Sequence, residues 1–310
     1  MAKQAEHAPV MLKEAVTALN VKADGVYVDG TFGRGGHARA ILSQLGPKGR
    51  LIGFDKDPLA IQSGELLAKE DDRFSIEQGS FTMLETVVES KGYKGKVDGI
   101  LLDLGVSSPQ IDDPARGFSF MNDGPLDMRM DTVHGQSAAQ WLAKAGERDI
   151  SQVLFDYGEE KHGKRIARAI VKHREENPLE TTRQLAELVA TASPSHDKHK
   201  HPATRSFQAI RIFINRELDD LTDTLAQVID VLNQEGRLSI ISFHSLEDRI
   251  VKRFIRKQMK GDDLPRDFPI TAAELNPKLR AIGKAVYASD EEIKVNPRSR
   301  SAVLRIAERV

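Results

Sequence analysis

A glycine-rich loop between an apolar run and a helix-like segment constrains the fold of this chain more than any other feature. The run Val26–Asp29 is β-branched and aromatic, and the following loop, residues 30–37, contains four glycines. Residues 38–45 then repeat apolar side chains at helical spacing. A strand, a glycine loop and a helix begin a nucleotide-binding α/β fold, because glycine allows a tight turn and close approach of a ligand. Taken alone, the loop fits an ordinary glycine turn equally well.

A second apolar run places an acid where such a fold uses one. Residues 50–55 end in Asp55, about twenty residues after the loop, where a βαβ unit holds a carboxylate beside ribose hydroxyls. Gly33, Gly35 and Ala38 also match the dinucleotide fingerprint. This part of the chain therefore fits both NAD and S-adenosylmethionine.

Three acids are expected along one edge of the sheet. Asp29, Asp55 and Asp103 each end a predicted strand, and ligands of open α/β sheets lie beyond the carboxyl ends of the strands. Three acids suit a cationic sulfonium better than a pyrophosphate. For Asp103 the alternative is a helix cap or a turn. Phe81 follows the third strand, where its ring would either cover an adenine or pack under the sheet.

The overall pattern predicts an α/β protein with a helical insertion. Strands are predicted at 26–29, 50–55, 74–79, 97–104, 238–243 and 302–307. Residues 137–215 are helical in pattern, and one long amphipathic stripe at 207–232 is predicted to return the chain to the sheet, with Gly236 ending that helix. We expect a discontinuous first domain, 1–108 and 214–310, and an inserted domain, 109–213.

Composition limits the cellular setting and the partners. The 310 residues include no cysteine, which suits a reducing cytoplasm. No run approaches the roughly 18 apolar residues of a membrane span, and residues 1–10 have no signal-peptide core, so no membrane association is expected. The net charge of −1 means that a nucleic acid would have to be met by a local patch.

The predicted insertion carries such a patch. Between Glu160 and Arg216 there are 12 lysines and arginines against six acids. Lys164, Arg165 and Arg168 lie on one basic helix face and are candidates for RNA binding, although basic faces are often only solvated. A zinc site at the nearby histidines is disfavoured, since no cysteine or clear fourth ligand accompanies them, and no metal is predicted. These histidines are His196, His199 and His201.

Two features near the C-terminus have plain structural explanations. His244, Ser245 and Asp248 resemble a hydrolase set, but neighbours in sequence rarely converge in space, and Ser245 with Asp248 is predicted to form a helix capping box. The helix predicted at 250–259 carries a second basic face. Its cations are Lys252, Arg253, Arg256 and Lys257.

Seven segments, in order along nearly the whole chain, are similar to one family, the MraW or methyltransferase H family of bacterial small-subunit ribosomal RNA methyltransferases. They are Asp29–His37, Asp103–Gln110, Arg116–Phe120, Gly124–Met130, Arg165–Ile170, His201–Arg205 and Ser242–Asp248. The resemblance implies a class I (Rossmann-like) S-adenosylmethionine-dependent methyltransferase sheet with an inserted helical domain for RNA recognition. It also implies methylation of N4 of a decoding-centre cytidine in 16S rRNA of the small ribosomal subunit. The cofactor contacts it implies are Gly35, Gly36, His37, Asp55, Phe81, Asp103 and Gln110.

The chemistry is consistent with this resemblance. Methylating carbon 5 of cytosine normally needs a cysteine nucleophile, and this chain has none. An exocyclic amine can attack the sulfonium methyl directly, without a covalent enzyme adduct, if it is aligned. Asp103, or a carbonyl in the turn after it, is the candidate for orienting the amine. The acidic-Pro-Pro-aromatic motif of many amino-methyltransferases is absent, which leaves open how the base is gripped.

Two other functions remain as alternatives. An NAD-dependent oxidoreductase would explain the glycine fingerprint but gives no role to Asp103 or the basic insertion. A non-catalytic RNA-binding assembly factor would keep the fold without methyl transfer. The sequence does not fix the oligomeric state, for which a homodimer is one option.

Overall fold

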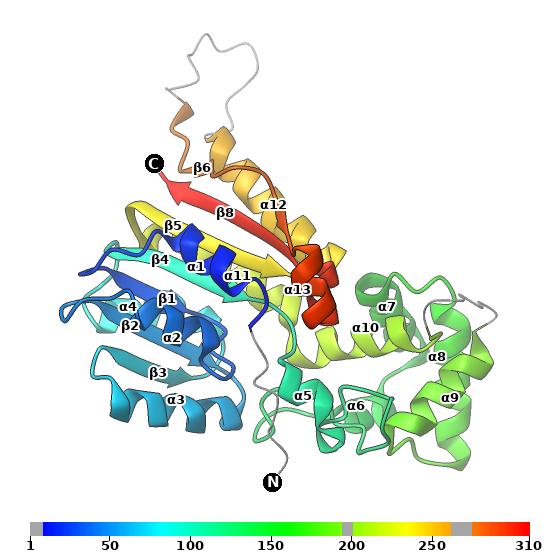
Figure 1. Cartoon of the computed structure of the whole chain (residues 1–310). Coiled ribbons are helices and arrows are strands. Elements are labelled where there is room, and N and C mark those ends of the chain that lie inside the picture. The colour runs from blue at the N-terminus through cyan, green and yellow to red at the C-terminus, as the bar shows by residue number, and fades with distance from the viewer. Residues whose placement is uncertain (1–8, 194–200, 262–274) are drawn as a thin grey trace, which may run out of the picture. The chain divides into compact units, whose positions relative to one another are not determined.

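The chain forms two compact units in the computed structural model, which describes residues 9–193, 201–261 and 275–310 (Figure 1). The first unit comprises Met1–Gly105 and Leu218–Val310, and the second comprises Val106–Glu217. The inserted unit thus begins three residues before, and ends four residues after, the range 109–213 that the sequence indicated.

An eight-stranded sheet organises the first unit. The strand order is β3-β2-β1-β4-β5-β8-β6, with β7 also paired to β8. The strands are β1 (Val26–Asp29), β2 (Arg50–Asp55), β3 (Phe74–Gln78), β4 (Val97–Asp103), β5 (Leu232–Ser242), β6 (Leu279–Ala281), β7 (Val286–Tyr287) and β8 (Val303–Arg309). The first five are parallel, whereas β8 runs antiparallel to β5, β6 and β7. The α/β prediction and all six predicted strands are confirmed, while β6 and β7 were not predicted.

Helices cover both faces of this sheet. They are α1 (Leu12–Leu19), α2 (Gly36–Leu42), α3 (Pro58–Glu70), α4 (Leu84–Ser90), α11 (Glu217–Val231), α12 (Ser245–Lys260) and α13 (Asp290–Val295), with short 3-10 turns at η1 (Phe81–Met83) and η4 (Pro297–Ser301). Side chains alternate between the two faces of a strand, so a strand covered on both faces must be apolar throughout. Tyr27 packs with α1 and α2, and its neighbour Val28 packs with α4 and α11.

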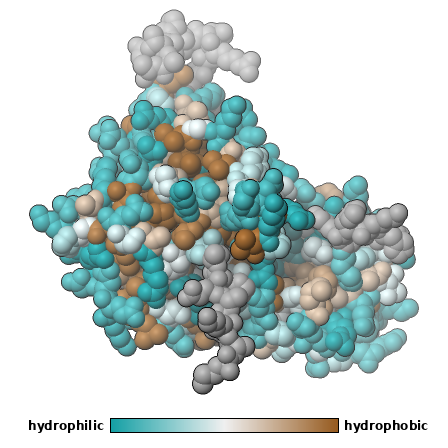
Figure 2. Space-filling model, viewed as in Figure 1, coloured by the Kyte–Doolittle hydropathy of each residue, from teal (hydrophilic) through white to brown (hydrophobic). Residues whose placement is uncertain are grey.

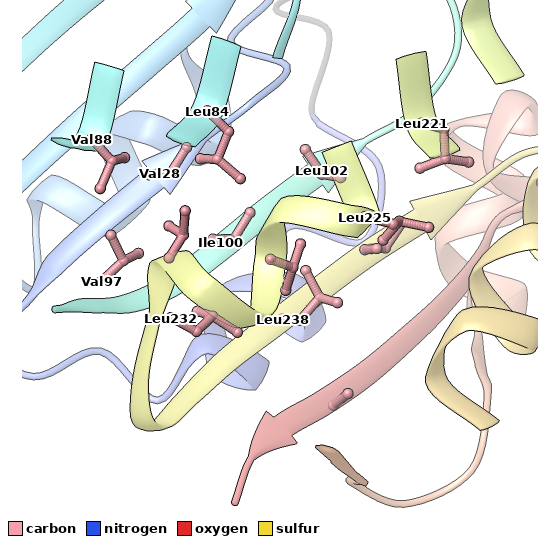
Figure 3. Close-up of a cluster of buried hydrophobic side chains, with 14 of the residues drawn as sticks. Val28, Leu84, Val88, Val97, Ile100, Leu102, Leu221, Leu225, Leu232 and Leu238 are labelled. Atoms are coloured by element: carbon pink, nitrogen blue, oxygen red, sulfur yellow. The ribbon is translucent and has the colours of Figure 1, made fainter. Parts of the chain in front are cut away.

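The core on the α4–α11–α12 side fixes the position of the central strands. Figure 3 shows Val28, Ile100 and Leu102 from the sheet facing Leu84 of α4 and Leu225 of α11. All five are at most 2% exposed. Burying one such side chain contributes about 1.5–3 kcal/mol, so these contacts hold the carboxyl ends of β1 and β4 rigidly side by side.

The second unit is helical. Its helices are α5 (Ser108–Asp112), α6 (Ala138–Lys144), α7 (Glu147–Gly158), α8 (Gly163–Glu176), α9 (Thr182–Ala192) and α10 (Thr204–Asn215), with a 3-10 turn at η2 (Pro114–Arg116). Its core is apolar and includes Trp141, which packs on Phe213 with ring centroids 4.6 Å apart. Leu126 and Met128, from the segment between η2 and α6, are also buried there, so part of that segment belongs to the core.

Two details of the predicted return to the sheet are wrong. The stripe at 207–232 is not one helix, because the chain breaks at Arg216, whose φ of 53° is left-handed. The Asn215 side chain accepts a hydrogen bond from Met130 N (2.7 Å) and donates one to Met128 O (2.7 Å), which anchors this break. Gly236 does not end a helix, since α11 ends at Val231 and Gly236 lies within β5.

Hydrophilic residues and scattered apolar patches share the surface visible in Figure 2. Among the described residues, none of the helices has the length and apolar character that a membrane crossing requires.

Candidate functional site

The loop after β1 has a backbone that requires glycine. Gly33 and Gly35 have φ values of 58° and 78°, which side chains rarely adopt. A Cβ on Gly35 would lie 2.7 Å from the Phe32 ring, and one on Gly36 would lie 2.1 Å from Pro9. The glycines therefore do more than form a turn, because they let the start of α2 approach neighbouring chain without a side chain between them.

Asp55 ties this loop to the end of β2. One carboxylate oxygen accepts a hydrogen bond from Gly33 N (2.7 Å) and the other accepts one from Asp57 N (2.8 Å). Burial raises the pKa of Asp55 to about 6, against the lowering effect of these hydrogen bonds. The Lys56 backbone also hydrogen-bonds to Asp55. Because a carboxylate has about four acceptor sites, about one remains for a ribose hydroxyl.

Asp29 and Asp103 lie at the ends of the neighbouring strands β1 and β4. Thr31 connects them, because its N–H donates to Asp29 Oδ1 (3.2 Å) and its hydroxyl oxygen accepts from Asp103 N (2.6 Å). Asp29 Oδ2 and Asp103 Oδ1 have no hydrogen-bond partner among the described residues. A buried polar group without a hydrogen-bond partner lowers the stability of the folded protein by about 1–3 kcal/mol.

The environment favours the neutral forms of both acids. Burial, reinforced by the nearby charge of Asp55, raises the pKa of Asp29 to about 7. The pKa of Asp103 is raised well above its usual value, first by burial and then by Asp29, Glu247 and Glu292. Its side chain is nevertheless 23% exposed, so a ligand can reach it. A cation placed here would lower these pKa values and convert the acids to carboxylates.

His37 faces the same cluster from the first turn of α2. Its Nε2 lies 3.2 Å from Val10 O, and since a carbonyl only accepts, Nε2 carries the proton. Its Nδ1 therefore presents a lone pair toward Asp103 Oδ2, 3.8 Å away. Burial lowers the pKa of His37 to about 4, so the ring is neutral at neutral pH.

Phe81 opens the 3-10 turn after β3, beside the glycine loop. The Phe81 side chain is half-buried. If Gly30 carried a Cβ, that atom would lie 3.3 Å from the Cβ of Phe81. Its ring packs on the edge of the core, which leaves both earlier interpretations of this ring open.

A polar network holds the Phe81 turn, and sequence reasoning missed it. Asp220 of α11 accepts from Ser80 Oγ (2.6 Å) and pairs with Lys56 Nζ (2.6 Å). One face of α11 also presents Gln227, which donates to Thr82 O (2.8 Å). No local motif marks Asp220, because its partners lie about 140 and 164 residues earlier in the chain.

The predicted site residues fall in both units. The first unit brings together the carboxyl-edge set, which comprises Gly35, Gly36, His37, Asp55, Phe81 and Asp103. Gln110 belongs to the second unit, where it is buried and its Oε1 accepts from Ser107 N (2.9 Å) in a capping box. Lys164, Arg165 and Arg168 are exposed on α8 of that unit, and Arg168 lies 3.5 Å from Glu147.

The hydrolase-like cluster does not form a catalytic triad among the described residues, and the histidine cluster lies partly outside them. His196 and His199 lie outside the described residues, and His201 packs against Phe120 with ring centroids 4.7 Å apart. Asp248 is held by two hydrogen bonds from Arg305 (2.6 and 3.0 Å), so it does not orient a histidine.

The predicted capping box is displaced by one residue. His244, not Ser245, is the N-cap of α12, and its partner is Glu247 rather than Asp248. The reason is that Glu247 turns inward to accept from Phe243 N (2.8 Å), where it is 2% exposed.

Comparisons with known proteins identify the family of this chain. The model of the MraW methylase family matches residues 4–310. The chain is 57% identical to ribosomal RNA small subunit methyltransferase H of Pseudoalteromonas atlantica, over 100% of both chains. It is 56% identical to the protein of the same name from Shewanella baltica, over 100% of this chain and 99% of that one. A solved rRNA methylase from Streptococcus thermophilus shares 10% identity and a TM-score of 0.44, over 100% of this chain and 99% of that one.

The whole-length family match and the two full-length relatives confirm the resemblance that the seven segments indicated. This chain belongs to the MraW methylase family.

Proposed function

We propose that this protein transfers the methyl group of S-adenosylmethionine to N4 of a cytidine in 16S rRNA of the small ribosomal subunit. Its family membership and its two full-length relatives support an rRNA methyltransferase. The observation that carries the assignment to an amine is the Asp103 carboxyl group at the carboxyl edge of the sheet, which is 23% exposed and whose buried Oδ1 has no hydrogen-bond partner among the described residues.

The carboxyl-edge set fits S-adenosylmethionine better than a dinucleotide. Asp55 has about one acceptor site left for a ribose hydroxyl, and the Phe81 ring can cover an adenine. Asp29 and Asp103 favour a positive charge, which a sulfonium supplies and a pyrophosphate does not. In this proposal Gly35, Gly36 and His37 line the cofactor site. Gln110 is proposed as a further contact from the second unit.

The proposed reaction needs no covalent enzyme adduct. The N4 lone pair forms the new bond to the methyl carbon, the electrons of the broken carbon–sulfur bond stay on sulfur, and the amine releases one proton to water. Asp103 accepts a hydrogen bond from the amine and aligns it, since an aligned nucleophile gains most of the available acceleration. The target base must leave its stack to reach this position.

His37 acts as a positioning residue in this scheme. Its unprotonated Nδ1 faces Asp103 Oδ2 and disfavours rotation of that carboxylate toward the ring, because two acceptors repel. His37 therefore helps to hold the Asp103 carboxyl group in the position where part of it is exposed to a ligand.

The inserted helical unit is proposed to recognise RNA. Lys164, Arg165 and Arg168 are exposed at helical spacing on α8, so they can contact the backbone phosphates of one strand.

The test is methyl transfer from labelled S-adenosylmethionine to small ribosomal subunits that lack the modification, with free 16S rRNA in parallel. Identification of the product nucleoside by mass should give N4-methylated cytidine. Transfer to carbon 5 or to another nucleotide would contradict the proposal. Cofactor binding without any transfer would favour a non-catalytic assembly factor, and binding of NAD alone would favour an oxidoreductase.

A further inference from the structure

Helix α12 carries one continuous stripe of positive charge on the sheet unit. Its exposed cations recur at helical intervals of three and four residues, and we call them the α12 stripe. They are Arg249, Lys252, Arg253, Arg256, Lys257 and Lys260. At 1.5 Å per residue the stripe is about 16 Å long.

The stripe is not neutralised by acids of its own helix. Of the two acids of α12, Glu247 is buried and Asp248 is paired with Arg305. Within the parts of the chain that the structure describes, four cations of the stripe form no ion pair; the exceptions, Arg249 and Lys260, have interactions of their own. Exposed helices usually mix both signs, and the whole chain has a net charge of only −1. This local surplus is therefore a specific feature of α12.

The stripe begins at the edge that holds the proposed site. Helix α12 follows β5, and β5 pairs in parallel with β4 so that Ile241 lies opposite Asp103. Glu247, in the first turn of α12, is close enough to raise the pKa of Asp103. The first cation of the stripe, Arg249, lies about half a helical turn after Glu247, and the others lie progressively farther from this edge along the helix.

The opposite face of α12 is committed to the core. Val251 and Ile255 are at most 5% exposed and pack against the sheet. A helix that binds a membrane surface needs an exposed apolar face beside its basic one. On α12 the large apolar side chain that is exposed among the described residues is Met259, which alone does not make such a face. The α12 stripe can therefore bind a partner mainly through its positive charge, which favours a polyanion with regularly spaced phosphates.

We propose that the α12 stripe binds the phosphate backbone of the substrate RNA next to the target nucleotide. This inference rests on the proposed function and adds a second RNA contact, on the sheet unit rather than the insertion. A strand whose target base lies at Asp103 would extend its flanking phosphates along α12.

The experiment compares two triple variants of the full-length protein. K252Q/R256Q/K257Q removes three charges from the stripe, and K13Q/K48Q/K69Q removes three exposed lysines from elsewhere on the same unit. Binding of fluorescently labelled 16S rRNA is measured by anisotropy over a range of salt concentrations. Binding of S-adenosylmethionine is measured by calorimetry.

The stripe variant should bind RNA about tenfold or more weakly. Its plot of log K against log salt should be less steep by about 2, because each lost phosphate contact removes about 0.7 from the slope. The matched control should keep the wild-type slope, and both variants should bind S-adenosylmethionine normally. K252R/R256K/K257R, which replaces each side chain but keeps its charge, should bind RNA as the wild type does.

Equal RNA affinity and equal salt slopes for the two triple variants would overturn the inference. It would also be overturned if the stripe variant lost binding to vesicles of anionic phospholipid while binding RNA normally. Failure of the proposed function is separate, because there the unaltered protein would transfer no methyl group to RNA.

Discussion

Asn215 of the inserted unit and the two acids Asp29 and Asp103 at the sheet edge differ in how their buried polar atoms are used. In the inserted unit the Asn215 amide is fully used, since it accepts from Met130 N and donates to Met128 O and Arg211 O. At the sheet edge, buried oxygens of Asp29 and Asp103 have no partner among the described residues. A buried polar group that supports a fold acquires partners, whereas one that serves a ligand is left available at a free-energy cost. The contrast between Asn215 and the two acids therefore supports the proposed ligand site at the sheet edge.

The largest effect should come from Asp103→Asn. Asparagine has the same shape and is neutral, and burial already favours the neutral acid at this position, so the protein should fold with unchanged stability. We expect kcat to fall about 100-fold or more, because the amine loses a carboxylate acceptor. Steady-state methyl transfer and thermal unfolding measure the two properties.

Asp98→Asn is the matched control for this variant. Asp98 lies at the opposite end of β4, where it accepts from Val26 N (3.0 Å) and Lys22 Nζ (3.2 Å). The Asp98→Asn protein should lose some stability and keep its methyltransferase activity. If Asp103→Asn turned over as fast as Asp98→Asn, the role given to Asp103 would be wrong.

The second prediction concerns Asp29 and pH. Its folded pKa of about 7 lies above the ordinary 3.8, so the folded state holds a proton that the unfolded state releases between these values. Stability should therefore fall as pH rises from about 4 through about 7. Asp29→Asn should remove this contribution, which is about 3 kcal/mol. Urea unfolding of both proteins at pH 5 and pH 8 tests this, and parallel changes in the two would contradict it.

The third prediction separates packing at the site from backbone strain. Gly35→Ala and Gly92→Ala place an alanine at nearly the same φ, 78° and 77°. A Cβ on Gly35 meets the Phe32 ring at 2.7 Å, whereas one on Gly92 meets nothing within 4 Å. Gly92→Ala should cost about 1 kcal/mol, and Gly35→Ala should cost about 1–3 kcal/mol more and weaken cofactor binding. Chemical denaturation and calorimetry would show this, and equal losses would mean that the loop has no close packing.

The smallest effect should come from Asp220→Asn. The change weakens the contacts with Lys56 and Ser80 that hold the Phe81 turn. KM for S-adenosylmethionine should rise about fivefold with kcat unchanged, because only cofactor binding is affected. Asp223→Asn, on the exposed side of the same helix, should leave both constants unchanged. A fall in kcat alone would assign Asp220 a different role.

Local sequence was enough to predict the carboxyl edge. Asp29, Asp55 and Asp103 each come at the end of a short apolar run typical of a buried strand, and parallel strands bring their ends together. The glycine loop was predictable for the same reason, since its spacing relative to β1 and α2 is fixed within a dozen residues.

What the sequence could not show depends on contacts distant in the chain. The break at Arg216 is anchored by Asn215 to residues about 85 positions earlier, and the helix-like apolar repeat continues unbroken across it. The same holds for Asp220, and for Glu292, which accepts from Met11 N 281 residues away and contributes to the field at Asp103. Such pairings follow from the assembled fold and carry no local pattern.

The most direct test of the central claim is the number of protons released when the cofactor binds. Calorimetry at pH 7 in buffers of different ionisation enthalpy would compare S-adenosylmethionine with S-adenosylhomocysteine, which lacks the positive sulfur. A sulfonium beside Asp29 and Asp103 lowers their raised pKa values, so S-adenosylmethionine should release more protons, and Asp103→Asn should reduce the difference. Equal proton release by the two ligands would contradict the placement of the sulfonium at these acids.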